Sequence, residues 1–206
     1  MSSPRKHVVF DVVGTCVSYD GIFEALDARL GDKLRAEGIK PKLLGYAWLE
    51  AAEREYTYLS ISNRYRRFDD VFRSLFYRVL WFAGVEQPRA FATEADLDFR
   101  VRGYFVRNGI DMPLENFRTC DQLKVGKPAP EAYRHMLDGF AGEEAWFAAA
   151  HMWDVSAAKA MGFKGAYCSI MEKEPCIDIF GEVDVMTDNF PDLARKLIEQ
   201  SEKNAQ

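Results

Sequence analysis

The hydrophobic pattern divides the chain into a long helical segment and regions in which strands alternate with helices. Residues 7–13, with the sequence HVVFDVV, form an almost continuous apolar run that ends at Gly14-Thr15. Such a run is typical of a strand that is covered on both faces in a parallel sheet. From about residue 22 to residue 85, apolar and aromatic side chains recur at helical spacing, which predicts a helical bundle.

The second half of the chain has shorter apolar runs separated by helical patterns. Strands are predicted at residues 117–120, 145–152, 165–169 and 183–186, and helices are predicted to begin at Pro130, at Val155 and after Pro191. Strands that alternate with helices indicate right-handed βαβ units. We therefore predict an α/β protein with a Rossmann-like, doubly wound parallel sheet and a helical cap inserted after the first strand. The expected core is residues 1–20 and 96–206, and the expected cap is residues 21–95.

The composition of this 206-residue chain is that of an ordinary globular protein, with 48% hydrophobic and 29% charged residues. The net charge of −5 argues against a nucleic acid partner, because phosphate binding needs a basic surface. The densest basic cluster, Arg64, Arg66 and Arg67, is interpreted as the solvated face of a helix.

Neither a signal segment nor a membrane span is evident in the sequence. The first residues are polar, and no apolar run approaches the ~18 residues that a membrane span needs. The four cysteines show no CxxC pairing, which favours reduced thiols over a disulfide frame or a zinc site. We therefore expect a cytoplasmic protein with no membrane partner.

Asp11 is the candidate nucleophile. It lies at the carboxyl end of the first predicted strand, where ligands bind in parallel α/β sheets. Gly14 permits a tight turn there, and the hydroxyl of Thr15 can hold the carboxylate by hydrogen bonding. A carboxylate held in this way can attack an electrophilic carbon or phosphorus and form an ester that water later hydrolyses.

Two further motifs follow in order along the chain. Lys127-Pro128-Ala129-Pro130 is followed by Tyr133, and His151-Met152-Trp153-Asp154 follows an apolar run. Together with FDVVGT at residues 10–15, these motifs resemble those of the haloacid dehalogenase superfamily, and they are most similar to its 2-haloacid dehalogenase branch. The resemblance extends over nearly the whole chain.

The resemblance implies a role for each of these residues. Asp11 would be the nucleophile, Lys127 its charge partner, and Asp154 a residue that holds Lys127 or orients water. At the position of His151 the family carries an asparagine, and we interpret His151 either as a base or as a hydrogen-bonded structural histidine. The resemblance also implies a small-molecule substrate and allows a homodimer. The predicted substrate-binding residues are Val12, Val13, Thr15, Tyr19, Glu50, Phe68, Tyr133 and Trp153.

The phosphatases of this superfamily are disfavoured by two positions. Val13 stands where they carry a second aspartate as general acid and base, and valine transfers no proton. Ala149 stands where they carry a carboxylate for magnesium. Asp11, the Val13 carbonyl and Asp154 alone are a poor set of ligands for an octahedral cation. We therefore expect no metal site and no cofactor, with magnesium as a poorly supported alternative.

Two departures separate the chain from the dehalogenases themselves. Glu50 lies near the position of the halide-binding arginine, where a carboxylate would repel halide and substrate, and this argues against true dehalogenation. The second family motif, a strand ending in Ser or Thr, is not found. Its only imitation is the segment 104–109, where Arg107 replaces the hydroxyl residue, and residues 101–108 are predicted to be helical. The segment at about 88–99 is short, which predicts the loss of a sheet strand.

Three functions remain open from the sequence. The first is a haloacid dehalogenase-like hydrolase that acts on a small organic molecule through Asp11. The second is an enzyme of the same fold that cyclises or rearranges an apolar substrate in natural-product biosynthesis, that is, in secondary metabolism. The third is a catalytically inactive binding protein.

Overall fold

The computed structural model describes residues 6–97, 116–140 and 142–203. The chain folds as two compact units, residues 1–18 together with 127–206, and residues 19–126. The predicted end of the cap near residue 95 stays a prediction, and the described segment 116–126 is grouped with the helical unit. None of the helices within the described ranges is both long enough and apolar enough to cross a membrane.

The first unit is built on a parallel sheet with the strand order β1-β2-β3-β4 among the described residues. The strands are β1 (Lys6–Phe10), β2 (Glu144–Ala149), β3 (Lys164–Cys168) and β4 (Val185–Thr187). Within this register Phe10 is paired with Ala148, and Ala149 with Tyr167, so the carboxyl ends of the first three strands lie at one edge. Residues that follow these ends are therefore brought together.

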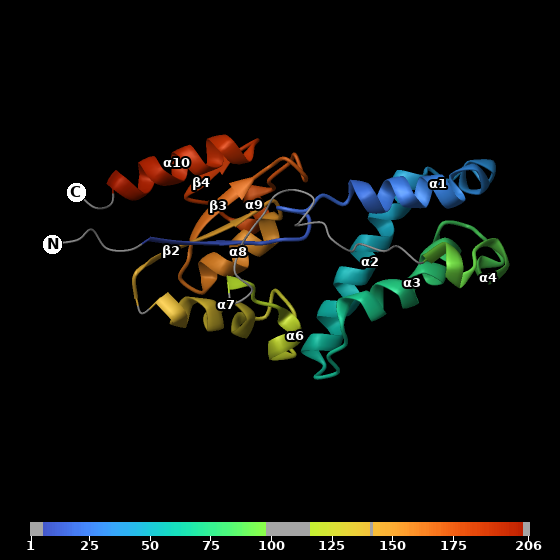
Figure 1. Cartoon of the computed structure of the whole chain (residues 1–206), viewed down its shortest axis with the longest axis horizontal. Coiled ribbons are helices and arrows are strands. Elements are labelled where there is room, and N and C mark those ends of the chain that lie inside the picture. Colours follow the sequence, from blue (N-terminus) through green and yellow to red (C-terminus); the bar gives the residue numbers. More distant parts are fainter. Residues whose placement is uncertain (1–5, 98–115, 141, 204–206) are drawn as a thin grey trace. The chain divides into compact units, whose positions relative to one another are not determined.

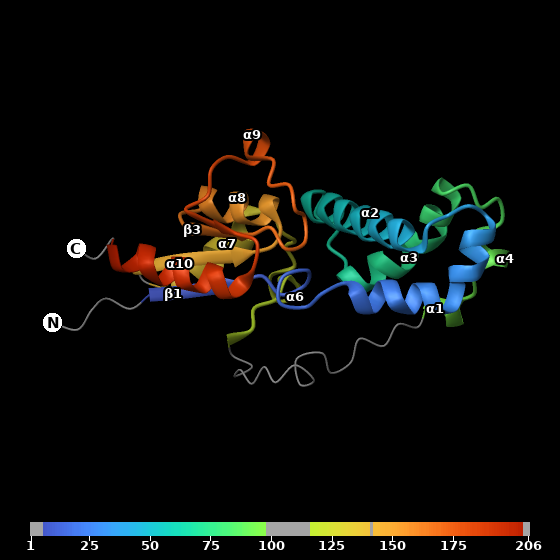
Figure 2. The ribbon, with the colours of Figure 1, turned by 90° about the horizontal axis from the view of Figure 1, so that it is seen from above.

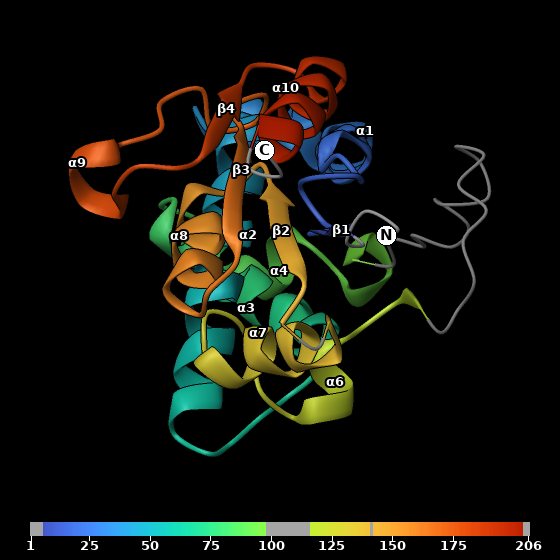
Figure 3. The same ribbon diagram turned by 90° about the vertical axis from the view of Figure 1, so that its left-hand side faces the viewer.

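Helices cover both faces of this sheet (Figures 1 and 3). The helices of the unit are α7 (Pro130–Leu137), η3 (Asp138–Phe140), α8 (Met152–Ala160), α9 (Ile177–Phe180) and α10 (Phe190–Lys203). On one face, α7 and α8 pack on Phe147 and Tyr167; on the other, α10 packs on Trp146 and Ala166. Alternate residues of β2 thus enter two separate cores, and the predicted doubly wound α/β architecture is confirmed.

Three predicted elements differ from the structure. Residues 117–120 are not a strand: Thr119 and Gln122 form a capping box that starts the short helix α6 (Cys120–Leu123). The first strand ends at Phe10, before Asp11. Helix α8 begins at Met152 and not at residue 155, which places Asp154 in its first turn. The helix predicted at residues 101–108 and the imitation of the second motif lie outside the described residues.

The second unit is a helical bundle, as the pattern predicts. Its helices are α1 (Asp20–Ala36), α2 (Pro41–Ile61), α3 (Phe68–Phe82), α4 (Pro88–Phe91), η1 (Glu94–Leu97) and α6. Helix α2 packs against both α1 and α3 (Figure 2). Trp48 is fully buried there; its ring stacks on Phe72 at 3.7 Å, and its indole N–H donates to the Phe72 carbonyl.

Candidate active site

Asp11 directly follows the last residue of β1 and is tied to the sheet. Its backbone N–H donates to the Ala148 carbonyl at 3.0 Å. Gly14 then adopts a φ of 87°, which returns the chain toward the carboxylate. The Thr15 hydroxyl donates to Asp11 Oδ2 at 2.7 Å and accepts from the Ala150 N–H at 2.9 Å. Both roles predicted from the FDVVGT motif, the tight turn and the threonine contact, are present.

Lys127 lies between two carboxylates. Its Nζ is 2.9 Å from Asp11 Oδ1 and 2.7 Å from Asp154 Oδ2. The same ammonium is 5.0 Å from the centre of the Phe147 ring, within the range of a cation–π contact. The structure thus brings the three separate sequence motifs together around one cation.

Asp154 is held by a second buried donor. It is almost fully buried, and the Tyr133 hydroxyl donates to its Oδ1 at 2.5 Å. Because Oδ2 accepts from Lys127, both oxygens of this carboxylate are hydrogen-bonded. Its place in the first turn of α8 also sets its charge near the positive end of the helix dipole. Asp154 is therefore arranged to hold Lys127.

His151 lies close to Oδ2 of the Asp11 carboxylate, the oxygen that also accepts from Thr15. It is the N-cap residue of α8, is 5% exposed, and has its Nδ1 3.7 Å from Asp11 Oδ2. That separation suits an ion pair when the ring is protonated but exceeds an ordinary hydrogen bond. The half-buried Trp153 lies beside it, with the ring centres 5.8 Å apart.

The electrostatics of the site keep Asp11 ionised. Burial alone would raise the pKa of Asp11, but His151, Lys127 and Thr15 outweigh it and hold that pKa well below its ordinary value. Burial would lower the pKa of Lys127, and the charges of Asp154 and Asp11 raise it instead. The pKa of Asp154 is raised, chiefly by burial, against the opposing effects of Lys127 and Tyr133. At neutral pH, Asp11 is thus a carboxylate beside an ammonium.

Glu172 is a residue of this site that the sequence did not single out. It follows β3, and its Oε2 accepts from the backbone N–H of Met152 at 2.8 Å and from the Tyr167 hydroxyl at 3.0 Å. Met152 is the first residue of α8, directly after His151. Glu172 therefore satisfies an N-terminal amide of the helix that carries Asp154. A lone glutamate in a polar loop carries no local signal that could have identified it.

The other predicted substrate-binding residues are divided between the two units. Val12 and Val13 lie in the turn after Asp11, where Val13 is 52% exposed. Tyr19, Glu50 and Phe68 belong to the helical unit. Within the helical unit, the hydroxyl of the buried Tyr19 donates to Glu53, and the ring of Phe68 packs edge-on against Tyr56. Glu50 is exposed on α2. Substrate binding by these five predicted positions stays a prediction.

The donor set at the site does not fit magnesium. The ammonium of Lys127 lies between Asp11 and Asp154, the two carboxylates that would have to share a divalent cation. Within the described ranges, no group of three or more His, Cys, Asp or Glu side chains is arranged for a metal ion, and the four cysteines are free. The absence of a cofactor stays a prediction.

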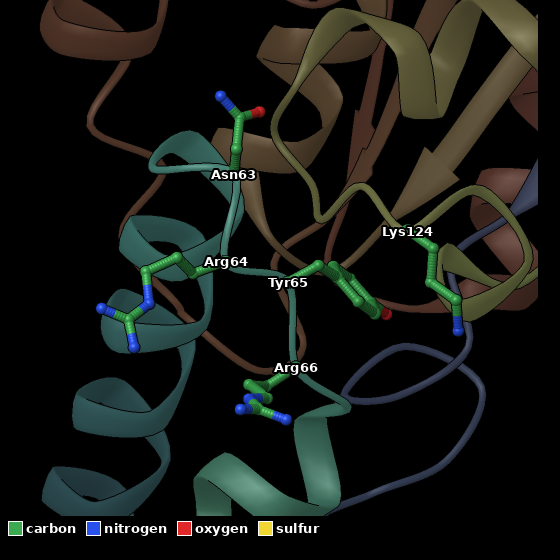
Figure 4. A pocket seen from close by; sticks show the side chains of 5 residues that line it. All are labelled: Asn63, Arg64, Tyr65, Arg66 and Lys124. Carbon is green, nitrogen blue, oxygen red and sulfur yellow. The ribbon is translucent and has the colours of Figure 1, made fainter.

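The basic cluster lies in a loop and not on a helix face, because α2 ends at Ile61 and α3 begins at Phe68. A cleft of about 390 Å³ opens there. It is lined by Asn63, Arg64, Tyr65, Arg66 and Lys124. Figure 4 shows the charged ends of Arg64 and Lys124 pointing in different directions, so the cations do not converge on one point.

Solved structures share this architecture over almost their full length. The L-2-haloacid dehalogenase from Xanthobacter autotrophicus is 16% identical with a TM-score of 0.67, and 93% of this chain and 98% of that chain are covered. The chain has the haloacid dehalogenase fold. A structure of the same enzyme with chloropropionic acid covalently bound is 17% identical, with a TM-score of 0.64 and the same coverage. Another structure described as a dehalogenase is 16% identical with a TM-score of 0.67, and 97% of this chain and 98% of that chain are covered.

Apart from the three motifs, the likeness to the haloacid dehalogenase fold comes from the three-dimensional comparison. No family model and no curated protein matches the sequence. At such low identity the solved structures establish the fold alone, which agrees with the resemblance inferred from the three motifs.

Proposed function

We propose that the protein is a haloacid dehalogenase-like hydrolase that acts on a small organic molecule, with Asp11 as the nucleophile. The observation that carries this proposal is the ionised Asp11 carboxylate at the carboxyl end of β1, held by Lys127 and Thr15. An ionised carboxylate in a fixed orientation can displace a leaving group from carbon and form an ester. A structure of the Xanthobacter enzyme, which has a similar fold, holds chloropropionic acid covalently bound, and this supports a covalent intermediate here.

The neighbours of Asp11 fit the two halves of such a reaction. In the first half, the lone pair of a carboxylate oxygen forms a bond to the substrate carbon, and the leaving group departs with its bonding electrons. In the second half, water attacks the carbonyl carbon of the ester. The Lys127 ammonium would stabilise the negative charge that develops on the carboxyl oxygen during this attack. Asp154 and Tyr133 would keep that ammonium in place.

Replacing Asp11 by asparagine tests the proposal. We expect Asp11→Asn to lower kcat/KM by a factor on the order of 10⁴ or more, because an essential nucleophile is removed while its shape is kept. The measurement is turnover of a panel of 2-haloacids, 2-haloamides and carboxylic esters. Asp138→Asn, at an exposed aspartate of the same unit, is the matched control and should leave turnover unchanged.

Oxygen labelling separates hydrolysis from cyclisation or rearrangement. In ¹⁸O-labelled water, a single turnover should place the label in the Asp11 carboxylate, and repeated turnover should place it in the product. Product formation without any solvent oxygen would favour the non-hydrolytic alternative. A wild-type protein that turns over nothing in the panel would contradict the hydrolase proposal.

A further inference from the structure

The Asp11 carboxylate is surrounded by groups that differ in their ability to accept a proton. The Thr15 hydroxyl donates to Oδ2, and Lys127, whose pKa is raised, donates to Oδ1. Both oxygens of Asp154 already accept hydrogen bonds, from Tyr133 and Lys127. A neutral imidazole has one ring nitrogen that can accept a proton. Of these neighbours, His151 is therefore the one suited to take a proton from water.

The geometry places His151 at the reacting carboxyl group. Its Nδ1 is 3.7 Å from Asp11 Oδ2, and the ring is 5% exposed. A water molecule that donated to Nδ1 at ordinary hydrogen-bond length would therefore lie close to the Asp11 carboxyl group. The N-cap position of His151 and the contact of Glu172 with the next amide fix this part of the backbone.

The charge balance around His151 changes during the proposed reaction. Before substrate reacts, the Asp11 and Asp154 carboxylates and the Lys127 ammonium carry a summed charge of −1. Formation of an ester on Asp11 removes one negative charge, so the same three groups then sum to zero. The uncharged form of an imidazole is the form that can act as a base.

We propose that His151 is the general base that activates water against the ester on Asp11. This inference rests on the proposed function. The water oxygen forms a bond to the Asp11 carboxyl carbon, and one water proton passes to His151. The bond between that carbon and the bridging ester oxygen, which came from Asp11 and stays with the substrate, then breaks. The departing alkoxide takes the proton of the new carboxyl group and leaves as an alcohol. Asp11 is again a carboxylate, and the proton on His151 exchanges with solvent.

The test is the fate of the covalent adduct in His151→Gln, which keeps a polar side chain but provides no base. Wild type and variant are reacted with 2-bromopropionate and with the neutral 2-bromopropionamide, then quenched with acid. Intact mass and peptide mapping identify the adduct on Asp11, and bromide release gives its rate of formation. We expect the variant to release about one equivalent of bromide and to retain the adduct, with decay slowed by about 10²–10⁴-fold.

The controls are His151→Asn and His135→Gln. His151→Asn should accumulate the adduct in the same way, and it replaces the glutamine variant if that one does not fold. His135 is an exposed histidine on α7 of the same unit, and its change should leave decay at the wild-type rate.

The possible failures have separate meanings. Equal decay of the adduct in wild type and His151 variants overturns the role of His151 while the proposed function stands. A folded His151 variant that forms no adduct, although wild type does, also overturns it, because the histidine would then act in the first half of the reaction. If no protein forms an adduct on Asp11, either with these two compounds or with any compound of the panel that wild type turns over, the nucleophile assignment itself is overturned, and this inference with it.

Discussion

Lys127 lies between two carboxylates in the first unit, and its ammonium compensates the repulsion between their negative charges. Asp154 is almost fully buried, and Asp11 is largely shielded from solvent. Two carboxylates in such a place repel each other unless a cation lies between them, and removal of one partner leaves an uncompensated buried charge. This single side chain therefore affects both the folding of the unit and the charge of the site.

Replacing Lys127 by methionine should destabilise the protein. The methionine fills a similar volume but leaves Asp11 and Asp154 without their shared cation, so we expect the free energy of unfolding to fall by about 3–5 kcal/mol. Urea titration at neutral pH measures the change. The double variant Lys127→Met with Asp154→Asn should recover part of the loss, because one of the two charges is then absent. An equally unstable double variant would contradict this explanation.

At the scale of elements, the N-terminus of α8 depends on a contact from another part of the chain. The backbone N–H of Met152 donates to Glu172, which follows β3. An amide in the first turn of a helix has no partner within the helix, and a carboxylate there is also favoured by the helix dipole. The turn that carries His151 and Asp154 is thus anchored by Glu172.

Removing the Glu172 carboxylate should loosen this turn. We expect Glu172→Ala to lower the free energy of unfolding by about 1–2 kcal/mol, because the hydrogen bonds that its carboxylate accepts from Met152 and Tyr167 are lost. Hydrogen exchange at the amides of residues 152–155 should also become faster. Glu174→Ala, an exposed glutamate of the same loop, is the control. Unchanged exchange in Glu172→Ala would show that α8 does not need this anchor.

At the scale of the whole first unit, Glu144 joins three elements at the end of the sheet opposite the site. Its carboxylate accepts from Lys164 of β3 at 2.6 Å, from Trp146 of β2 at 2.9 Å, and from Ser201 of α10. Burial would raise its pKa, but these hydrogen bonds and the charge of Lys164 lower it from 4.5 to about 2. The folded state therefore favours the ionised form of the Glu144 carboxyl group.

This depressed pKa predicts an acid-dependent contribution to stability. A carboxylate with a lower pKa in the folded state stabilises the fold above its ordinary pKa, here 4.5, and the contribution is lost as pH falls toward 2. We expect Glu144→Gln to cost roughly 1–3 kcal/mol at pH 7, and the difference from wild type to shrink between pH 4.5 and 2. Urea titrations across this range measure it, with Glu199→Gln on α10 as the control. A difference that does not change with pH would contradict the assignment.

Much of the fold was predictable because its signals are local. A continuous apolar run predicts a covered strand, and helical spacing of aromatic residues predicts a bundle; both need only neighbouring positions in the chain. Asp11 follows β1 and Asp154 lies in the helix after β2, and the register of these two strands brings both residues to one edge of the sheet. The capping box at Thr119 was also a local signal, and it was missed in favour of a short strand.

The sequence by itself determined the strand and helix types and the residues available for chemistry, because each depends on positions close together in the chain. Only the tertiary structure decided how those residues meet. Lys127 reaches Asp11 across 116 positions and Asp154 across 27, and Glu172 reaches Met152 across 20. Hydrogen bonds between side chains so far apart depend on strand register and on burial, and no local pattern encodes either of them.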